Sequence, residues 1–323
     1  MFRINGSLLP AQEQPEYSEI KKMIDNLMGD AQKKVFAEGR DVDFAYRIDE
    51  NLRLRVNVFR YANGIAASLR LLNNDIPSLQ QLGLPEVLNS LVEQQRGLIL
   101  ITGPTGSGKS TTLASMIDHI NETRAEHIIT IEDPIEYIHH NKLSIVHQRE
   151  AGRDVSTFAE ALRSSLREDP DIILVGEMRD YETISAAVTA AETGHLVMST
   201  LHTTGAAQTI DRIIDVCPPN AQNQIRTQLA GVLSGVITQC LIPNIQNDAR
   251  HPATEVLIGS DAVLNMIREN KCFQLPTAMQ SAGAAGMHTL NNDLARLVKT
   301  GKISVQNAYK YSNNKKELEQ YGI

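Results

Sequence analysis

A glycine-rich octapeptide, Gly103–Ser110, constrains the fold of this 323-residue chain more than any other feature. It reads Gly-Pro-Thr-Gly-Ser-Gly-Lys-Ser and matches the pattern G-x-x-x-x-G-K-[ST]. The apolar run Leu98–Ile101 precedes it, and a helical pattern over Thr111–Asn121 follows it. The glycines let backbone N–H groups wrap phosphate oxygens at a helix N-terminus. The sequence therefore predicts a strand, a phosphate-binding loop and a helix in that order.

Individual residues of this loop have predicted roles. The Lys109 ammonium is expected to reach the β- and γ-phosphates of a nucleoside triphosphate, and the Ser110 hydroxyl is expected to ligate Mg²⁺. The glycines contribute backbone donors rather than side chains. The predicted nucleotide-binding residues are Gly103, Pro104, Thr105, Gly106, Ser107, Gly108, Lys109, Ser110 and Thr111.

Beyond residue 86 the hydrophobic pattern indicates an α/β domain built on a mostly parallel sheet. Short apolar runs alternate with amphipathic helical stretches, as expected when each strand is buried on both faces. Helix-start signals agree, since Thr157 with Glu160 forms a capping-box pattern and Asp180 can cap a helix that ends before Gly194. The predicted strands are Leu98–Ile101, Ile128–Ile131, Ile172–Val175 and Leu196–Met198.

The first 72 residues have a different pattern of polar and apolar residues, which is typical of a small α+β unit. Apolar residues at helical spacing predict a helix over Tyr17–Phe36. Two strands are predicted at Val42–Ile48 and Leu52–Phe59, with a polar turn at Asp49–Asn51 between them.

The strand predicted at Leu52–Phe59 alternates strictly, so it should present Arg53, Arg55 and Asn57 on one solvated face. The polar stretch at residues 73–85 contains Pro and Gly and is typical of a linker. We therefore predict an N-terminal domain with its linker over residues 1–85 and a second domain over 86–323. Short helices are expected after about residue 255, and a solvated tail is expected over the last dozen residues.

Two acidic segments follow predicted strands, where side chains face the ligand crevice of a parallel sheet. Glu177 comes after Ile172–Val175 and Gly176, so it could orient or deprotonate an attacking water, or hold Mg²⁺ through water. The alternative for Glu177 is a helix-capping glutamate. Glu132–Glu136 follows the strand Ile128–Ile131, and its alternative is a charged turn with no role.

Two histidines flank the strand predicted at Leu196–Thr200. His202 lies at its C-terminal end, where a group that senses the γ-phosphate would sit, whereas a lone histidine is more often structural. A metal site is disfavoured, because His195 and His202 lack the helical i, i+4 spacing. Cysteines are scattered without a C-x-x-C pair, which disfavours a zinc knuckle and fits a reducing cytosol.

Composition excludes several classes of protein. The net charge of −7 and the absence of Trp argue against a dedicated nucleic-acid binder, which needs clustered Lys and Arg or an aromatic platform. No apolar run reaches the roughly 18 residues of a membrane span, and the N-terminus lacks the pattern of a signal peptide.

Four segments together resemble the type IV pilus retraction, or twitching-motility, ATPases of the type II/type IV secretion ATPase superfamily. The resemblance covers about residues 15–310. Two departures accompany it: the family's N-terminal segment before Phe2–Leu9 is missing or short, and Leu264 replaces an arginine in the family's retraction motif, here Ala262–Glu269. The matching segments are Gly103–Ser110, the acidic box Ile131–Glu136, the region Ile172–Asp180 and the histidine box Thr193–Thr203.

The resemblance implies a PAS-like α+β domain followed by a RecA-like P-loop domain with a helical C-terminal region. It implies a cytoplasmic homohexamer that binds ATP and Mg²⁺ between the two domains. Glu177 would be the general base, Glu136 an acidic-box partner, and His202 a contact of the γ-phosphate. Arg55 and Arg60 would approach the neighbour's nucleotide as arginine fingers, although an alternating polar face also arises from solvation alone.

Three functions remain open from the sequence. The first is a motor that hydrolyses ATP to retract pili, acting peripherally at the inner membrane through a platform protein, with other pilus ATPases as further candidate partners. The second is an assembly or secretion motor, which usually carries a four-cysteine zinc motif and a long N-terminal extension. The third is an accessory, nucleotide-gated protein that binds the platform and turns over ATP poorly. No nucleic-acid partner is expected.

Overall fold

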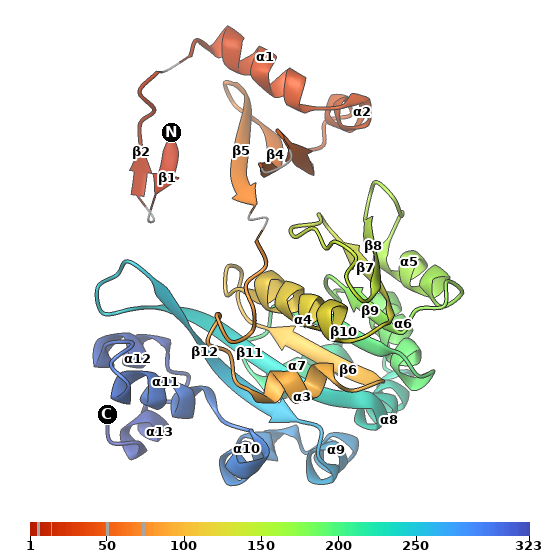
Figure 1. The fold of residues 1–323 in the computed structure, drawn as a ribbon, viewed down its shortest axis with the longest axis vertical. Coiled ribbons are helices and arrows are strands. Elements are labelled where there is room, and N and C mark those ends of the chain that lie inside the picture. Colours follow the sequence, from red (N-terminus) through yellow and green to blue (C-terminus); the bar gives the residue numbers. More distant parts are fainter. Residues whose placement is uncertain (5–6, 14, 50–51, 73–74) are drawn as a thin grey trace. The chain divides into compact units, whose positions relative to one another are not determined.

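The computed structural model describes residues 1–4, 7–13, 15–49, 52–72 and 75–323 (Figure 1). Part of the predicted turn (residues 50–51) and part of the predicted linker (73–74) lie outside the described residues. The chain forms two compact units: unit 1 is Met1–Asp75 with Pro134–Ile138, and unit 2 is Ile76–Asp133 with His139–Ile323. Unit 2 begins before the predicted boundary at residue 85, because Leu79 is buried with core residues of that unit.

The described residues of unit 1 form a pair of short antiparallel strands, two helices and an antiparallel sheet in strand order β3-β4-β5. The single predicted helix over Tyr17–Phe36 is wrong, because the chain turns to an extended conformation at Met28 and a new helix starts after Gly29. Its elements are β1 (Phe2–Ile4), β2 (Ser7–Leu9), α1 (Tyr17–Leu27), α2 (Asp30–Ala37), β3 (Val42–Arg47), β4 (Arg53–Tyr61) and β5 (Gly64–Leu72).

The core of unit 1 forms on one face of this sheet. Leu54, Val56 and Val58 alternate inward along β4 and pack with Ile24 and Phe36 of the helices. This burial follows from the period-two pattern of the strand.

Arg53 departs from the predicted solvated face of β4, because it is buried. Its guanidinium donates to the Ile135 carbonyl at 2.6 Å and to the Glu136 carbonyl at 3.2 Å. These acceptors satisfy the buried charge, which explains why a strand position that looks polar in sequence is enclosed.

In the described part of unit 2, a sheet of seven strands has the order β12-β11-β6-β10-β9-β7-β8. All four predicted strands are present and parallel to their neighbours. The sequence did not predict β8, β11 or β12, and β12 runs antiparallel to β11. The strands are β6 (Gly97–Thr102), β7 (His127–Glu132), β8 (Ile145–Glu150), β9 (Ile172–Val175), β10 (Leu196–Leu201), β11 (Leu233–Pro243) and β12 (Arg250–Ile258).

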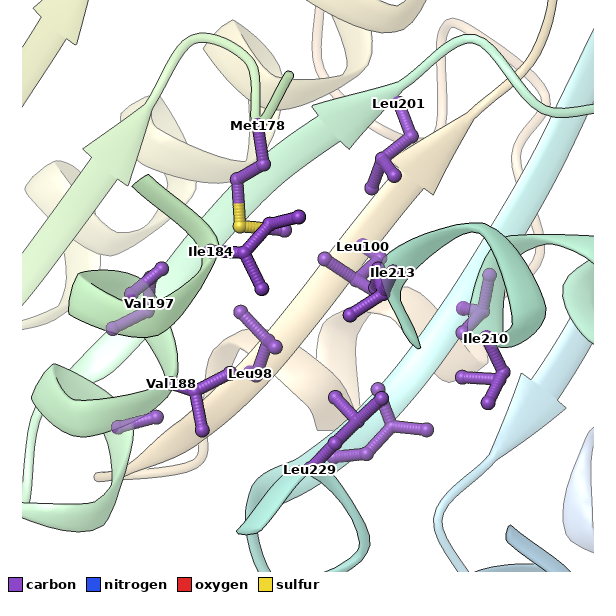
Figure 2. Close-up of a cluster of buried hydrophobic side chains, with 14 of the residues drawn as sticks. Leu98, Leu100, Met178, Ile184, Val188, Val197, Leu201, Ile210, Ile213 and Leu229 are labelled. Atoms are coloured by element: carbon purple, nitrogen blue, oxygen red, sulfur yellow. The ribbon is translucent and has the colours of Figure 1, made fainter. Parts of the chain in front are cut away.

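Helices cover both faces of this sheet, as an α/β fold requires. Alternate residues of β6 show the division: Ile99 packs with buried residues of α3 and α4, and Leu100 packs with buried residues of α5 to α8. Figure 2 shows Leu98 and Leu100 of β6 among buried side chains of α6, α7 and α8. The helices are α3 (Val87–Val92), α4 (Lys109–Thr123), α5 (Phe158–Ser165), α6 (Tyr181–Glu192), α7 (Ala206–Asp215) and α8 (Gln222–Val232).

The C-terminal region is helical, and the predicted solvated tail is wrong. Asn314 caps a last helix, and Leu318 on it is fully buried with Leu294 and Ile303. One apolar anchor in a six-residue helix leaves no periodic signal in the sequence. Across the described ranges, no helix has both the length and the hydropathy needed to cross a membrane. The elements are α9 (Asp261–Arg268), η1 (Cys272–Gln274), α10 (Leu275–Ser281), η2 (Gly283–Ala285), α11 (Leu290–Lys299), α12 (Val305–Tyr311) and α13 (Lys315–Gln320).

Candidate active site

The sheet of unit 2 brings the predicted segments to one edge. Strands β6, β10, β9 and β7 are neighbours, and their C-terminal ends lie side by side, with Leu201 opposite Thr102 and Val175 opposite Ser199 and Ile131. The carboxyl ends of parallel strands form the ligand crevice of such a sheet. The segments that follow these four strands begin at Gly103, His202, Gly176 and Asp133.

The loop after β6 has the backbone of a phosphate cradle. Gly103, Gly106 and Gly108 adopt φ angles of 140°, 79° and 92°, which side-chain-bearing residues rarely take. A Cβ atom at Gly103 would lie 2.2 Å from the Gln239 carbonyl oxygen. Only glycine allows this loop to fold so tightly against strand β11.

The side chains of the loop fit a bound nucleotide. Lys109 is buried, and its ammonium donates to the Gly103 carbonyl at 2.8 Å and the Pro104 carbonyl at 3.2 Å. The Ser107 hydroxyl is buried and has no hydrogen-bond partner among the described residues. Ser110 is exposed on the first turn of α4, where its hydroxyl can reach a ligand. Buried polar groups of this kind are satisfied by an anionic ligand at a helix N-terminus.

Glu177 occupies the loop after β9. Its carboxylate lies 2.6 Å from the Arg179 guanidinium and 3.5 Å from His202 Nε2, and its side chain is only 14% exposed. This geometry places the predicted base and the predicted γ-phosphate contact next to each other. Glu177 therefore contacts Arg179 and His202 rather than a helix N-terminus, and Asp180 caps α6.

Thr200 holds the loop that carries Glu177, a role that the sequence did not predict. Its hydroxyl donates to the Gly176 carbonyl at 2.6 Å, and its carbonyl accepts from the Met178 N–H at 3.2 Å. Gly176 is also sterically constrained, because a Cβ atom there would lie 3.1 Å from the Ile131 carbonyl oxygen. A side chain at this position would therefore crowd the end of β7.

His202 lies between the P-loop strand and the Glu177 loop, and its side chain is half exposed. The residues after it lead into α7, and the hydroxyls of Thr203 and Thr209 share a hydrogen bond of 2.7 Å there. Glu255 of β12 accepts from the Ala206 N–H at 2.7 Å and so anchors the start of this helix. Burial raises the pKa of the Glu255 carboxyl above its usual range.

The acidic box is divided between the two units. Glu132, in unit 2, accepts from the Thr130 hydroxyl at 2.6 Å and from Gln148 Nε2 at 3.0 Å. Glu136, in unit 1, pairs with the Arg55 guanidinium at 3.2 Å. Both carboxylates therefore have defined partners, Glu132 in unit 2 and Glu136 in unit 1.

The two predicted arginine fingers also belong to unit 1. Arg55 pairs with Asp43 at 2.8 Å in addition to Glu136. The Arg60 guanidinium lies 4.0 Å from the centroid of the Phe36 ring, a cation–π arrangement. In this subunit, then, the P-loop, Glu177 and His202 share unit 2, whereas Arg55, Arg60 and Glu136 share unit 1.

A P-loop follows β6, His202 follows the neighbouring strand β10, and Glu177 follows β9, the next strand of the sheet. This arrangement defines a RecA-like P-loop ATPase. Comparison with known proteins narrows this class. The whole chain, residues 1–323, matches the family described as Type II/IV secretion system protein. The chain belongs to this family, and within it to the type IV pilus retraction ATPases, which are ATP-hydrolysing enzymes.

Three relatives carry this assignment. The "Type IV pilus retractation ATPase PilT" of Pseudomonas aeruginosa is 48% identical over 95% of this chain and 90% of its own length. The "Twitching motility protein" of Neisseria gonorrhoeae is 45% identical over 98% of this chain and 85% of its own length. A crystal structure of the pilus retraction motor PilT with bound ADP superposes with a TM-score of 0.90 at 47% identity, covering 98% of this chain and 91% of that one.

Proposed function

We propose that this chain is the subunit of a cytoplasmic homohexameric motor that hydrolyses ATP to retract type IV pili. The observation that carries the proposal is the joint presence of Lys109, Glu177 and His202 at one edge of the sheet in a chain that matches retraction ATPases over almost its whole length. The motor would reach the inner membrane through a platform protein of the pilus machine.

In the proposed mechanism, the P-loop backbone and Lys109 hold the phosphates, and bound ATP supplies the phosphoryl group that is transferred. Glu177 accepts a proton from the attacking water, and its low exposure keeps competing solvent from the carboxylate. His202, 3.5 Å from Glu177, donates toward the γ-phosphate end of the site. Thr200 keeps the Glu177 loop in place through the Gly176 carbonyl.

Mg²⁺ is part of the proposal, with Ser110 as a direct ligand and Glu177 as a partner through water. Within the described residues, no group of three or more His, Cys, Asp or Glu side chains forms a metal site. A Mg²⁺ ion held by one hydroxyl therefore needs phosphate oxygens and water for its other positions, which is its usual arrangement in ATPases.

Arg55 and Arg60 are proposed to act on the nucleotide of a neighbouring subunit, with Glu136 as the partner that holds Arg55 ready. Arg55 would have to exchange Asp43 or Glu136 for a phosphate, and Arg60 would have to leave the Phe36 ring. Both exchanges are feasible because ion pairs and cation–π contacts at partly exposed sites contribute little, about 0.5–1 kcal/mol each.

Deletion of the gene tests the direction of the motor. A retraction motor predicts surface pili that persist or accumulate while retraction is lost. Loss of surface pili on deletion would instead indicate an assembly motor, and normal pilus dynamics would indicate an accessory protein. Re-expression of the wild-type chain is the control for each outcome.

A further inference from the structure

Gln239 is a buried polar residue in the mostly apolar strand β11, and it lies against the phosphate loop. The residue is only 2% exposed. It is far from the loop in sequence, 132 residues from Ser107. A buried amide needs hydrogen-bond partners for both its ends, so the partners indicate what the residue does.

Both partners of the Gln239 amide belong to the nucleotide site. Its Nε2 donates to the Ser107 carbonyl at 2.6 Å, and its Oε1 accepts from the Thr112 hydroxyl at 2.9 Å. A carbonyl can only accept, so the N–H end must face Ser107, and this fixes the orientation of the amide. One side chain thereby ties the phosphate loop to the first turn of α4.

The glycines of the loop make room for this contact. A Cβ atom at Gly108 would lie 2.9 Å from Gln239 Nε2, and one at Gly103 would lie 2.2 Å from the Gln239 carbonyl oxygen. The loop is therefore in close contact with Gln239. Substitution of either glycine would separate the loop from this support.

The backbone of Gln239 is itself held firmly. It pairs with Thr254 of β12, and Thr254 donates to the Asp293 carboxylate of α11 through its N–H at 2.8 Å and its hydroxyl at 3.1 Å. The amide thus projects from a strand pair fixed on both sides. A rigid support of this kind is what a preorganised binding loop needs.

We propose that Gln239 is a positioning residue of the nucleotide site. It holds the Ser107 carbonyl and the Thr112 hydroxyl so that the N–H groups of the loop and the Lys109 ammonium point toward the β- and γ-phosphates. Gln239 acts through the loop and does not touch the nucleotide. The inference rests on the nucleotide-binding role of the loop.

Calorimetric titration of the full-length protein with ADP and Mg²⁺ tests the proposal. Gln239→Met keeps the length of the side chain and removes both hydrogen bonds, so ADP should bind about tenfold more weakly. Thr238→Val is the matched control, because Thr238 is buried on the same strand and its hydroxyl bonds Thr102 outside the loop. The control should bind ADP like the wild type, even if both variants unfold at lower temperature.

Gln239→Glu adds a readout that a purely structural role would not move. The ionised carboxylate cannot donate to the Ser107 carbonyl, whereas the protonated form can. The ratio of the variant Kd to the wild-type Kd should therefore fall as the pH is lowered from about 8 to about 5.5, since burial raises the pKa of a carboxyl and favours its protonated form as the pH falls.

Two results would overturn the role of Gln239 while the wild type still binds ADP. One is ADP affinity of Gln239→Met within about twofold of the wild type or of the Thr238→Val control. The other is a Kd ratio of Gln239→Glu that stays constant with pH. Failure of the wild-type protein to bind ADP would overturn the nucleotide-binding role itself.

Discussion

At the scale of residues, Glu177 combines low exposure with two close side-chain partners, Arg179 and His202. We predict that Glu177→Gln binds ATP but hydrolyses it about 10²–10⁴-fold more slowly, because the amide cannot accept the proton from water. Steady-state ATPase assays and retention of bound ATP after a single turnover measure this. Glu182→Gln, at an exposed glutamate on α6, is the control.

Lys109 leads to a separate prediction. Lys109→Ala removes the charge that contacts the β- and γ-phosphates, so both nucleotide affinity and hydrolysis should be lost. Equilibrium binding of ADP and ATPase assays check the two effects independently. Wild-type affinity in this variant would mean that the loop backbone alone binds the phosphates.

His139 should make the stability of the protein depend on pH. Burial lowers the pKa of its imidazole from 6.5 to about 4, with Asp118 opposing the shift and Lys142 and His140 adding to it. Between these values the unfolded chain binds a proton that the folded chain does not, so stability should fall as the pH falls through this window. Denaturant unfolding of His139→Gln should show a flatter pH dependence, whereas His140→Gln, at an exposed position, should keep most of the wild-type slope because His140 is the weakest of these influences.

Residues of the site differ in how far the sequence could predict them. The P-loop, Glu177 and His202 follow from local patterns, since each comes directly after an apolar strand. Thr200 and Gln239 could not be predicted, because their partners lie 24 and 132 residues away. A polar residue inside an apolar strand was the available signal, but the strand β11 was itself not predicted.

At the scale of elements, β6, β7, β9 and β10 were predictable because strands buried on both faces are continuous apolar runs. The remaining strands of unit 2 carry mixed patterns. β8 is an edge strand with exposed Ile145 and His147, and β12 begins with the polar residues Arg250 and His251. Tertiary packing, rather than local propensity, decides such elements.

The last helix gives a prediction at the same scale. Leu318 is the buried anchor of α13, so Leu318→Ala should destabilise the C-terminal region by about 2–4 kcal/mol. Hydrogen exchange of amides in α11 and α12, together with the unfolding midpoint, measures the loss. The neighbouring Glu319→Ala is exposed and should leave both unchanged. Equal effects of the two substitutions would mean that the helix is not anchored by Leu318.

At the scale of the whole molecule, the segment Pro134–Ile138 was the least predictable feature. It follows the carboxyl end of β7 in sequence, yet it belongs to unit 1, where Arg53 and Arg55 bind its carbonyls and carboxylate. No local pattern signals this, because Arg55 lies 81 residues from Glu136 in the sequence and Arg53 lies 82 residues from Ile135. Their alternation on β4 predicted an exposed face instead.

Action of Arg60 on a neighbouring subunit predicts a specific pattern in mixed assemblies. Mixing Arg60→Ala with Lys109→Ala should restore part of the ATPase activity, because a site with Lys109 can receive Arg60 from the other subunit. Mixing Glu177→Gln with Lys109→Ala is the matched control and should give no rescue, because both residues belong to the same unit 2. Absence of rescue in the first mixture at every ratio would rule out a trans role for Arg60.

Direct observation of labelled pili tests the central claim, that ATP hydrolysis at this site retracts type IV pili. The measurement is the frequency and speed of retraction in a deletion strain that expresses either the wild-type chain or Glu177→Gln. We predict normal retraction with the wild-type chain and extended, non-retracting pili with the variant. Retraction at the wild-type rate with Glu177→Gln, or a lack of pili in the deletion strain, would contradict the account.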